Sequence, residues 1–367
     1  MRRTLTALLG LALSVPMAAG AATAGTVTPS PDDPEVIAEG LLSPLSLAVS
    51  KDDKKLWFSQ NFAGLLMKSK GGAEPQVVYS ADGGTEVGAV SARGKGATFA
   101  TTAPDGTTAL MAISRRGDVS TLADLSGHEE SENPDADNAY GVVGISDECA
   151  AEWPADDFGP ATYTGIVESH PYASTSMRGK RYVADAAANA IISVGGKGAV
   201  RTVAVLPPQP LTISAEMAEG LGLPDCVVGL DYLFEPVPTD VEKGPDGKLY
   251  VTTLPGGPED PSLGARGAVH RIDPRKGKVE TVATGLLSAT GLAVASNGDM
   301  YVAELFGGSI ARIPAGSSTP EPWASVGLPG DVELGTSGLW ATTNVLTGLS
   351  GEPGDEPMGE VVLFGGQ

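Results

Sequence analysis

The most constraining feature of this chain is a short phrase that occurs six times: an aromatic residue, two small or β-favouring residues, and a polar residue. The six copies begin at Trp57, Phe99, Tyr182, Tyr250, Tyr301 and Trp340. One unit of this size cannot bury its own apolar face, so it must stack on further copies of itself. The repeat therefore predicts an architecture of stacked, β-rich units.

Two distant segments support a true repeat. Residues 37–49 and 282–294 align without a gap and are identical at eight of thirteen positions. The second copy runs into alternating segments joined by Asn297-Gly298, which is a strong hairpin signal. Four antiparallel strands per unit, with a period near forty residues, are typical of a β-propeller blade. Six aromatic phrases thus predict six blades.

The two ends of the chain complement each other in this scheme. The last unit has a third strand near residues 359–363 but no chain left for a fourth. Residues 36–39 align with a fourth strand of the repeat, so we expect the N-terminal strand to complete the last blade. Such closure removes a free sheet edge. We predict an all-β fold, a single six-bladed β-propeller over residues 35–367 whose ring is closed by an N-terminal strand.

The N-terminus has the pattern of a secretory signal peptide. Arg2 and Arg3 precede an apolar run over residues 5–19, and Ala22-Thr23-Ala24 has the form of a cleavage site. A membrane anchor is the alternative, but Pro16 interrupts the run, which is shorter than a span requires. We expect a signal peptide at 1–24, a flexible lead-in at 25–34, and a secreted, extracellular protein without a membrane span.

The charge balance limits the partners. The chain has 45 acidic and 24 basic side chains and a formal net charge of −21. Nucleic acid and anionic lipid are repelled by such a surface. We expect a monomer that binds a small-molecule, glycan or protein ligand. Large negative charge also keeps secreted proteins soluble, and most of these carboxylates serve that purpose in our interpretation.

Two inserts interrupt the spacing of the repeat, at 124–165 and 207–236. Cys149 lies in the first and Cys226 in the second, and the chain has no other cysteine. In an oxidising compartment this pair predicts one disulfide that ties the inserts together. The first insert contains eleven Asp and Glu residues and no Lys or Arg. Either it carries recognition or it is a solvated acidic loop.

A ligand site is expected at one mouth of the propeller. The connection that enters strand one and the loop after strand two lie at the same end of every blade, so their residues converge there. The polar residues that we expect at this mouth are Gln60, Asn61, Glu86, His170, Tyr172, Asp185, Asp240, Glu304, Asp331 and Asn344. His170 is either a structural hydrogen-bonding residue or a general base. No cofactor is predicted firmly, but Asp185, Asp240 and Glu304 together could bind Ca²⁺, which prefers oxygen ligands.

Several phrases resemble one known family. Ser169-His170-Pro171-Tyr172, Val237-Pro238-Thr239-Asp240 and the segment 244–251 resemble the ScyD/ScyE family of secreted bacterial propellers. More distantly, the chain is similar to NHL-repeat and gluconolactonase-like six-bladed propellers. The first resemblance covers nearly all of the chain after the signal peptide. It implies an exported bacterial protein in a family named after gene clusters for the pigment scytonemin.

Two functions remain open. The favoured one is a non-catalytic binding or scaffold propeller that recognises its ligand at the central mouth. The alternative is a divalent-metal-dependent hydrolase of lactonase or esterase type, with mouth carboxylates as metal ligands and His170 as base. We favour binding because catalysis needs a convergent set of residues that the sequence only hints at. Other chemistries are excluded, since the chain contains no Gly-x-Ser-x-Gly, His-Glu-x-x-His or phosphate-loop motif.

Overall fold

The computed structural model describes residues 30–258 and 261–366. The predicted signal peptide at 1–24 and residues 25–29 of the predicted lead-in lie outside these ranges. Within the described ranges, no helix has both the length and the apolar character needed to cross a membrane.

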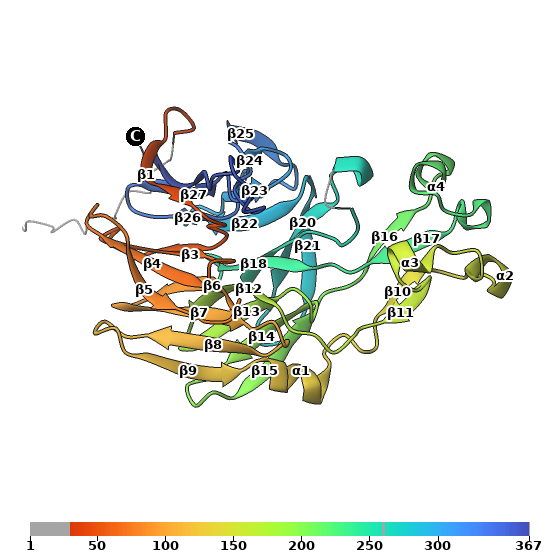
Figure 1. Cartoon of the computed structure of the whole chain (residues 1–367), viewed down its shortest axis with the longest axis horizontal. Coiled ribbons are helices and arrows are strands. Elements are labelled where there is room, and N and C mark those ends of the chain that lie inside the picture. Colours follow the sequence, from red (N-terminus) through yellow and green to blue (C-terminus); the bar gives the residue numbers. More distant parts are fainter. Residues whose placement is uncertain (1–29, 259–260, 367) are drawn as a thin grey trace, which may run out of the picture.

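In five four-stranded antiparallel sheets each strand pairs with the next along the chain, and a sixth sheet has the same arrangement except that its fourth strand comes from the N-terminus (Figure 1). We name each sheet after its first strand. The β2 sheet contains β2 (Leu47–Val49), β3 (Lys55–Gln60), β4 (Leu65–Lys70) and β5 (Gln76–Ser80). The β6 sheet contains β6 (Glu86–Arg93), β7 (Gly96–Thr102), β8 (Thr108–Ile113) and β9 (Val119–Asp124). The β12 sheet contains β12 (Pro171–Met177), β13 (Lys180–Asp185), β14 (Ala190–Val194) and β15 (Val200–Val205).

The remaining three sheets come from the C-terminal half, with one strand from the N-terminus. The β18 sheet contains β18 (Pro238–Lys243), β19 (Leu249–Thr253), β20 (Gly267–Ile272) and β21 (Val279–Leu286). The β22 sheet contains β22 (Ala289–Val294), β23 (Met300–Glu304), β24 (Ser309–Ile313) and β25 (Glu321–Ser325). The β26 sheet contains β26 (Val332–Leu334), β27 (Gly338–Thr343), β28 (Gly359–Gly365) and β1 (Glu35–Leu41).

The N-terminal strand β1 is the fourth strand of the β26 sheet. It runs antiparallel to β28, with Glu35 opposite Leu363 and Leu41 opposite Gly359. Figure 1 shows β1 next to the C-terminal end of the chain. The segments 37–49 and 282–294 therefore hold equivalent places, since each spans a fourth strand and the first strand of the following sheet.

Each aromatic residue of the repeated phrase lies in the second strand of one of these six sheets. Their side chains pack between sheets, because each of six apolar clusters combines residues from two neighbouring sheets. Trp57 packs with Phe99 across the β2 and β6 sheets, and Trp340 packs with Phe58 across the β26 and β2 sheets. Burial of this apolar surface, at about 25 cal/mol per Å², is the main force that stacks the sheets.

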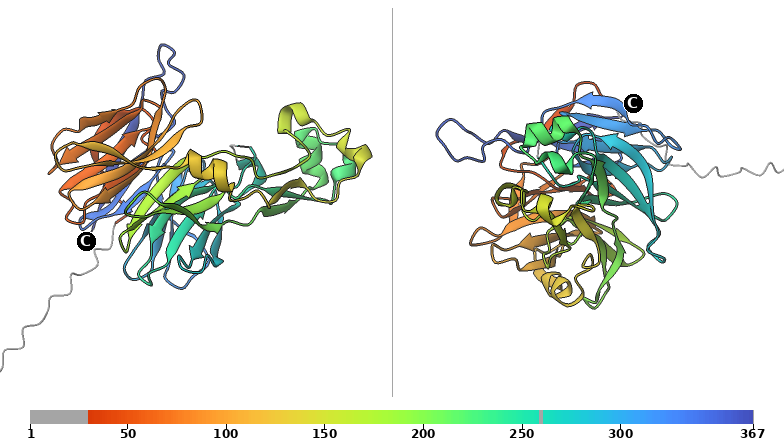
Figure 2. Two further views of the ribbon diagram at one scale, coloured as in Figure 1. Left: turned by 90° about the horizontal axis from the view of Figure 1, so that it is seen from below. Right: turned by 90° about the vertical axis from the view of Figure 1, so that its right-hand side faces the viewer.

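A seventh sheet is built from both inserts together, and we call it the insert sheet. Its order is β11-β10-β17-β16, with β10 (Ala139–Val142) and β11 (Thr162–Thr164) from the first insert, and β16 (Gln209–Thr212) and β17 (Asp231–Phe234) from the second. The short helices are α1 (Ser126–Glu132), α2 (Asp147–Ala150), α3 (Ala155–Phe158), α4 (Ala215–Leu221), η1 (Asp225–Val227) and η2 (Pro261–Leu263). The insert sheet, with α2, α3 and α4, projects away from the other sheets (Figure 2).

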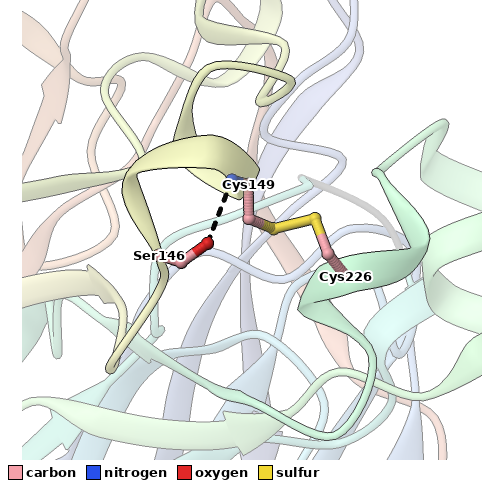
Figure 3. The surroundings of a disulfide bond; sticks show 3 residues. All are labelled: Ser146, Cys149 and Cys226. Atoms are coloured by element: carbon pink, nitrogen blue, oxygen red, sulfur yellow. Dashed lines mark hydrogen bonds between the residues drawn. A yellow bond between two sulfur atoms is a disulfide. The ribbon is translucent and has the colours of Figure 1, made fainter.

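The inserts have their own small core, in which Trp153, Ile213 and Val227 pack together. The predicted disulfide is confirmed: Cys149 and Cys226 are bonded, with their Cα atoms 5.9 Å apart and a sequence separation of 77 (Figure 3). Ser146 begins α2, and its Oγ accepts a hydrogen bond from the Cys149 amide at 3.2 Å. The inserts are therefore one ordered, crosslinked structure, and their folding into helices and a shared sheet was not predicted from the sequence.

Candidate functional site

A cavity of about 470 Å³ lies where the connections that enter first strands meet the loops that follow second strands. We call it the mouth cavity. Its apolar lining includes Leu45, Phe62, Tyr172, Leu254, Phe306 and Leu346. Its polar lining includes Ser46, Thr239, Asp240, Thr290 and Asp331. A concave, mostly apolar site with a few placed polar groups is the usual form of a small-molecule site.

The structure separates the ten predicted site residues into three groups. Tyr172, Asp240 and Asp331 line the mouth cavity. Asn61, Glu86 and His170 line a shallow hollow beside it, which also includes Phe62 and Tyr172. Gln60, Asp185, Glu304 and Asn344 line neither of these two depressions.

Three of the polar residues that end second strands bind the backbone of their own sheet. Gln60 Oε1 accepts a hydrogen bond from the Leu42 amide at 2.8 Å. Asp185 Oδ1 accepts one from the His170 amide at 2.7 Å, and Glu304 Oε1 accepts one from the Leu287 amide at 2.7 Å. In each case the donor lies in the connection that enters the first strand, so these side chains fix that connection. We call these three contacts the strand-end links.

Asp240 and Asp331 hold neighbouring sheets together while they line the cavity. Asp240 Oδ2 accepts a hydrogen bond from the amide of Leu292 in β22 at 2.6 Å. Asp331 Oδ2 accepts one from the amide of Leu47 in β2 at 2.7 Å. The other carboxylate oxygen of each residue accepts the amide of the next residue along the chain. The two aspartates are thus held rigidly at the cavity.

Two glutamates extend this acidic group. Glu242 follows Asp240 by two positions, so both lie on one face of β18. Glu333 in β26 likewise follows Asp331, which directly precedes that strand, by two positions. Burial raises the pKa of Glu242 to about 8, and the negative charge of Asp331 adds to the effect. Burial also raises the pKa of Asp331 to about 7. Burial and mutual repulsion raise the pKa values of Asp240 and Glu333 well above their ordinary range. Protonated carboxyls are therefore available near neutral pH as hydrogen-bond donors.

His170 forms a pair with Glu86 next to the mouth cavity. Its Nε2 lies 3.3 Å from Glu86 Oε2, and its ring lies 5.1 Å from the ring of Tyr172, measured between centroids. The hydrogen bond to Glu86 raises the pKa of His170 against the opposing effect of burial. Because this favours the protonated imidazolium, the pair is less suited to general-base catalysis at neutral pH.

The predicted calcium ligands do not fit a shared metal ion. Asp185, Asp240 and Glu304 accept hydrogen bonds from three different parts of the backbone, at His170, Leu292 and Leu287 respectively. Over residues 30–258 and 261–366, no group of three or more His, Cys, Asp or Glu side chains is arranged to hold a metal ion. These three residues therefore do not form one metal site.

The apolar lining of the mouth cavity was not predicted, although the sequence contains a signal for it. Phe62 follows Gln60 by two positions, and Leu305 follows Glu304 directly. Leu254 likewise follows the phrase that ends at Thr253. An apolar side chain that follows the end of a second strand lies outside the sheet. It therefore lines the mouth cavity instead of packing between two sheets.

No family model matches this chain, and no curated protein sequence matches it. Solved structures do match it over most of its length. A gluconolactonase from Xanthomonas campestris matches with a TM-score of 0.53 and 11% identity, over 94% of this chain and 98% of that one. A PQQ-bound aldose sugar dehydrogenase from Streptomyces coelicolor matches with a TM-score of 0.51 and 13% identity, over 92% and 99%.

A luciferin-regenerating enzyme matches with a TM-score of 0.52 and 9% identity, over 90% of this chain and 94% of that one. At these identities the likeness concerns the fold alone. Together with the stacked four-stranded sheets, it defines the class of this protein as an all-β propeller.

Proposed function

We propose that this protein is a non-catalytic binding propeller that takes up a small organic ligand in the mouth cavity. The observation that carries the proposal is the lining of that cavity. Aromatic side chains such as Phe62, Tyr172 and Phe306 lie beside buried polar groups such as Asp240 and Thr239. This combination fits a ligand with an apolar face and several hydroxyl or amine groups.

The proposal includes the architecture predicted from the repeat. The six sheets with one strand order are six blades of a ring, and β1 closes that ring in the β26 sheet. In support, the apolar clusters link the β2, β6, β12, β18, β22 and β26 sheets in turn, and one cluster joins the β26 sheet back to the β2 sheet. The insert sheet is then a projection beside the mouth.

We further propose an exported bacterial protein of ScyD/ScyE type that acts as a monomer. The N-terminal pattern of residues 1–24 and the disulfide support export, since disulfides persist in oxidising compartments. The phrases around His170, Asp240 and Tyr250 support the family assignment. Size-exclusion chromatography with light scattering tests the monomer.

The test uses a panel of aryl glycosides and aryl amino alcohols, which combine an aromatic face with donor groups. Differential scanning fluorimetry identifies members that raise the melting temperature, and calorimetric titration measures their affinity. Phe306→Ala should weaken binding about tenfold or more, because it removes an apolar wall of the cavity. Phe158→Ala, in the inserts, is the matched control. If no member binds, or if the two variants behave alike, the proposal is wrong.

The hydrolase alternative is tested with the same protein. A lactone and ester panel is assayed with EDTA and with millimolar Ca²⁺, and the melting temperature is recorded under both conditions. We expect no turnover, because His170 is paired with Glu86 and the three carboxylates expected as calcium ligands are engaged separately. Calcium-dependent turnover that is lost in Asp240→Asn or Glu304→Gln would restore the hydrolase interpretation.

A further inference from the structure

A second cavity, of about 540 Å³, lies between the insert sheet and the loop that follows β19. We call it the insert cavity. The first insert contributes Trp153, Phe158 and Tyr163, and the second contributes Tyr232 and Phe234. Gly256, Gly257 and Pro258 line both cavities, so the insert cavity lies directly beside the mouth cavity. Its volume is in the range of cavities that enclose small organic ligands.

The aromatic side chains of the insert cavity form a continuous surface. The rings of Trp153 and Tyr232 are nearly parallel, at 19°, with centroids 6.1 Å apart. Tyr232 contacts Phe234 at 4.5 Å, and Trp153 contacts Phe158 at 6.2 Å, both measured between centroids. Aromatic faces carry negative charge density and attract cations as well as apolar groups.

The electrostatics of the cavity favour a cation. Among the described residues, the charged side chains that line it are Asp157 and Glu235, both acidic, and the cationic Arg266 contacts the Phe234 ring. Glu235 is held in place by two donors, since its Oε1 accepts the Tyr163 hydroxyl at 2.9 Å and its Oε2 accepts Asn189 Nδ2 at 3.1 Å. Neither insert, at 124–165 or 207–236, contains a Lys or Arg residue. An acidic surface of this kind concentrates cations near the cavity.

The wall between the two cavities is fixed by a residue from outside the inserts. The guanidinium of Arg266 lies 4.2 Å from the centre of the Phe234 ring and donates hydrogen bonds to the carbonyl oxygens of Pro255 and Gly256. Gly257 has a φ of +116°, and a Cβ at this position would lie 2.9 Å from the Phe234 ring. The arginine thus secures the wall by backbone contacts.

We infer that the insert cavity is a second binding site, separate from the mouth cavity, and that it takes an amphiphilic cation: an apolar body with an ammonium group. The apolar body packs on the aromatic faces and on side chains such as Met217 and Leu223. The ammonium group lies against Glu235 and Asp157. This inference does not depend on the function proposed for the mouth cavity.

The test compares three probes that share one apolar body: 4-phenylbutylamine, which is cationic at pH 7, the neutral 4-phenylbutan-1-ol, and the anionic 4-phenylbutyrate. Binding to the disulfide-bonded protein is measured by calorimetric titration and by tryptophan fluorescence, to which Trp153 contributes. We expect the amine to bind about tenfold more tightly than the alcohol. This ratio corresponds to the combined contribution of a partly desolvated cation–π contact and an ion pair with a carboxylate. The carboxylate probe should bind most weakly.

Three variants locate the site. Glu235→Gln and Asp157→Asn should each reduce the preference for the amine over the alcohol to about threefold or less without weakening the alcohol. Asp157 is exposed in the short helix α3, so its replacement leaves folding intact and keeps the test valid if Glu235→Gln destabilises the inserts. Tyr232→Ala should weaken all three probes. Phe306→Ala, in the mouth cavity, is the matched control and should change none of them.

Two results would overturn the inference. The first is equal affinity for the amine and the alcohol, or no saturable binding of the amine at millimolar concentration. The second is loss of binding in Phe306→Ala with retention in Tyr232→Ala, which would place the probe in the mouth cavity instead.

Discussion

Removal of the Cys149–Cys226 bond should destabilise the inserts strongly. The bond closes a loop of 77 residues that contains the whole β12 sheet. For a loop of this length, the entropy of closing it in the unfolded chain corresponds to about 4–5 kcal/mol at 25 °C. The bond also joins α2 of the first insert to η1 of the second, on either side of the small core around Trp153.

The perturbation is the double variant Cys149→Ser, Cys226→Ser, studied by urea unfolding with two probes. Tryptophan fluorescence includes Trp153 in the inserts, and far-ultraviolet circular dichroism reports mainly on the six sheets. We expect the variant either to lose about 4 kcal/mol in a single transition or to unfold its inserts first in a separate fluorescence transition. In the second case, binding of 4-phenylbutylamine to the insert cavity should also weaken.

Ser146→Ala provides the matched control for this prediction. It removes the Oγ that accepts the Cys149 amide at the start of α2, but it leaves the disulfide intact. Loss of such a cap costs about 1 kcal/mol. If the double variant loses no more stability than Ser146→Ala and still binds the amine, the argument from loop closure is wrong for this protein.

Three further predictions concern the sheets. Truncation through Leu41 should lower the free energy of unfolding by roughly 3 kcal/mol or more, because it removes β1 and a buried leucine. Truncation through Asp33 should lower it little. Equal melting temperatures of the two truncated proteins would exclude a structural role for β1. Glu304→Ala should cost about 1–3 kcal/mol in urea unfolding because the Leu287 amide loses its acceptor, and Glu304→Gln should restore most of it. The free energy of unfolding should fall as the pH rises from about 5 to 9. In the folded state the pKa is about 7 for Asp331 and about 8 for Glu242, so the folded state binds more protons than the unfolded state in that range. Glu242→Gln should reduce this pH-dependent loss of stability by roughly 2 kcal/mol. A melting temperature that rises with pH would contradict the predicted direction.

The sequence predicted the features that depend on local patterns. Aromatic residues such as Trp57 and Tyr301 recur with the strand they occupy, because every sheet needs the same bulky side chain between itself and its neighbour. The all-β propeller class followed from this repeat. The pairing of Cys149 with Cys226 followed from their number alone.

The features that depend on contacts between distant segments were missed. Nothing in residues 139–142 indicates that they pair with residues 231–234 across an intervening sheet, so the insert sheet was not expected. The polar residues Gln60 and Glu304 were expected at a ligand site, yet they form strand-end links to the backbone. Residue type alone does not distinguish these two roles, because the same acceptor serves a ligand and an amide equally well.

The pairing of β1 with β28 sets an order for the folding of the newly made chain. Glu35 is among the first residues of the described chain to leave the ribosome, and its partner Leu363 is among the last. The β2, β6, β12, β18 and β22 sheets each form from one continuous stretch of chain, so they can assemble while synthesis proceeds. The β26 sheet is complete only after β28 has been made. A strand edge therefore stays open until then, and a chain that lacks β28 would remain prone to pairing with other chains through this edge.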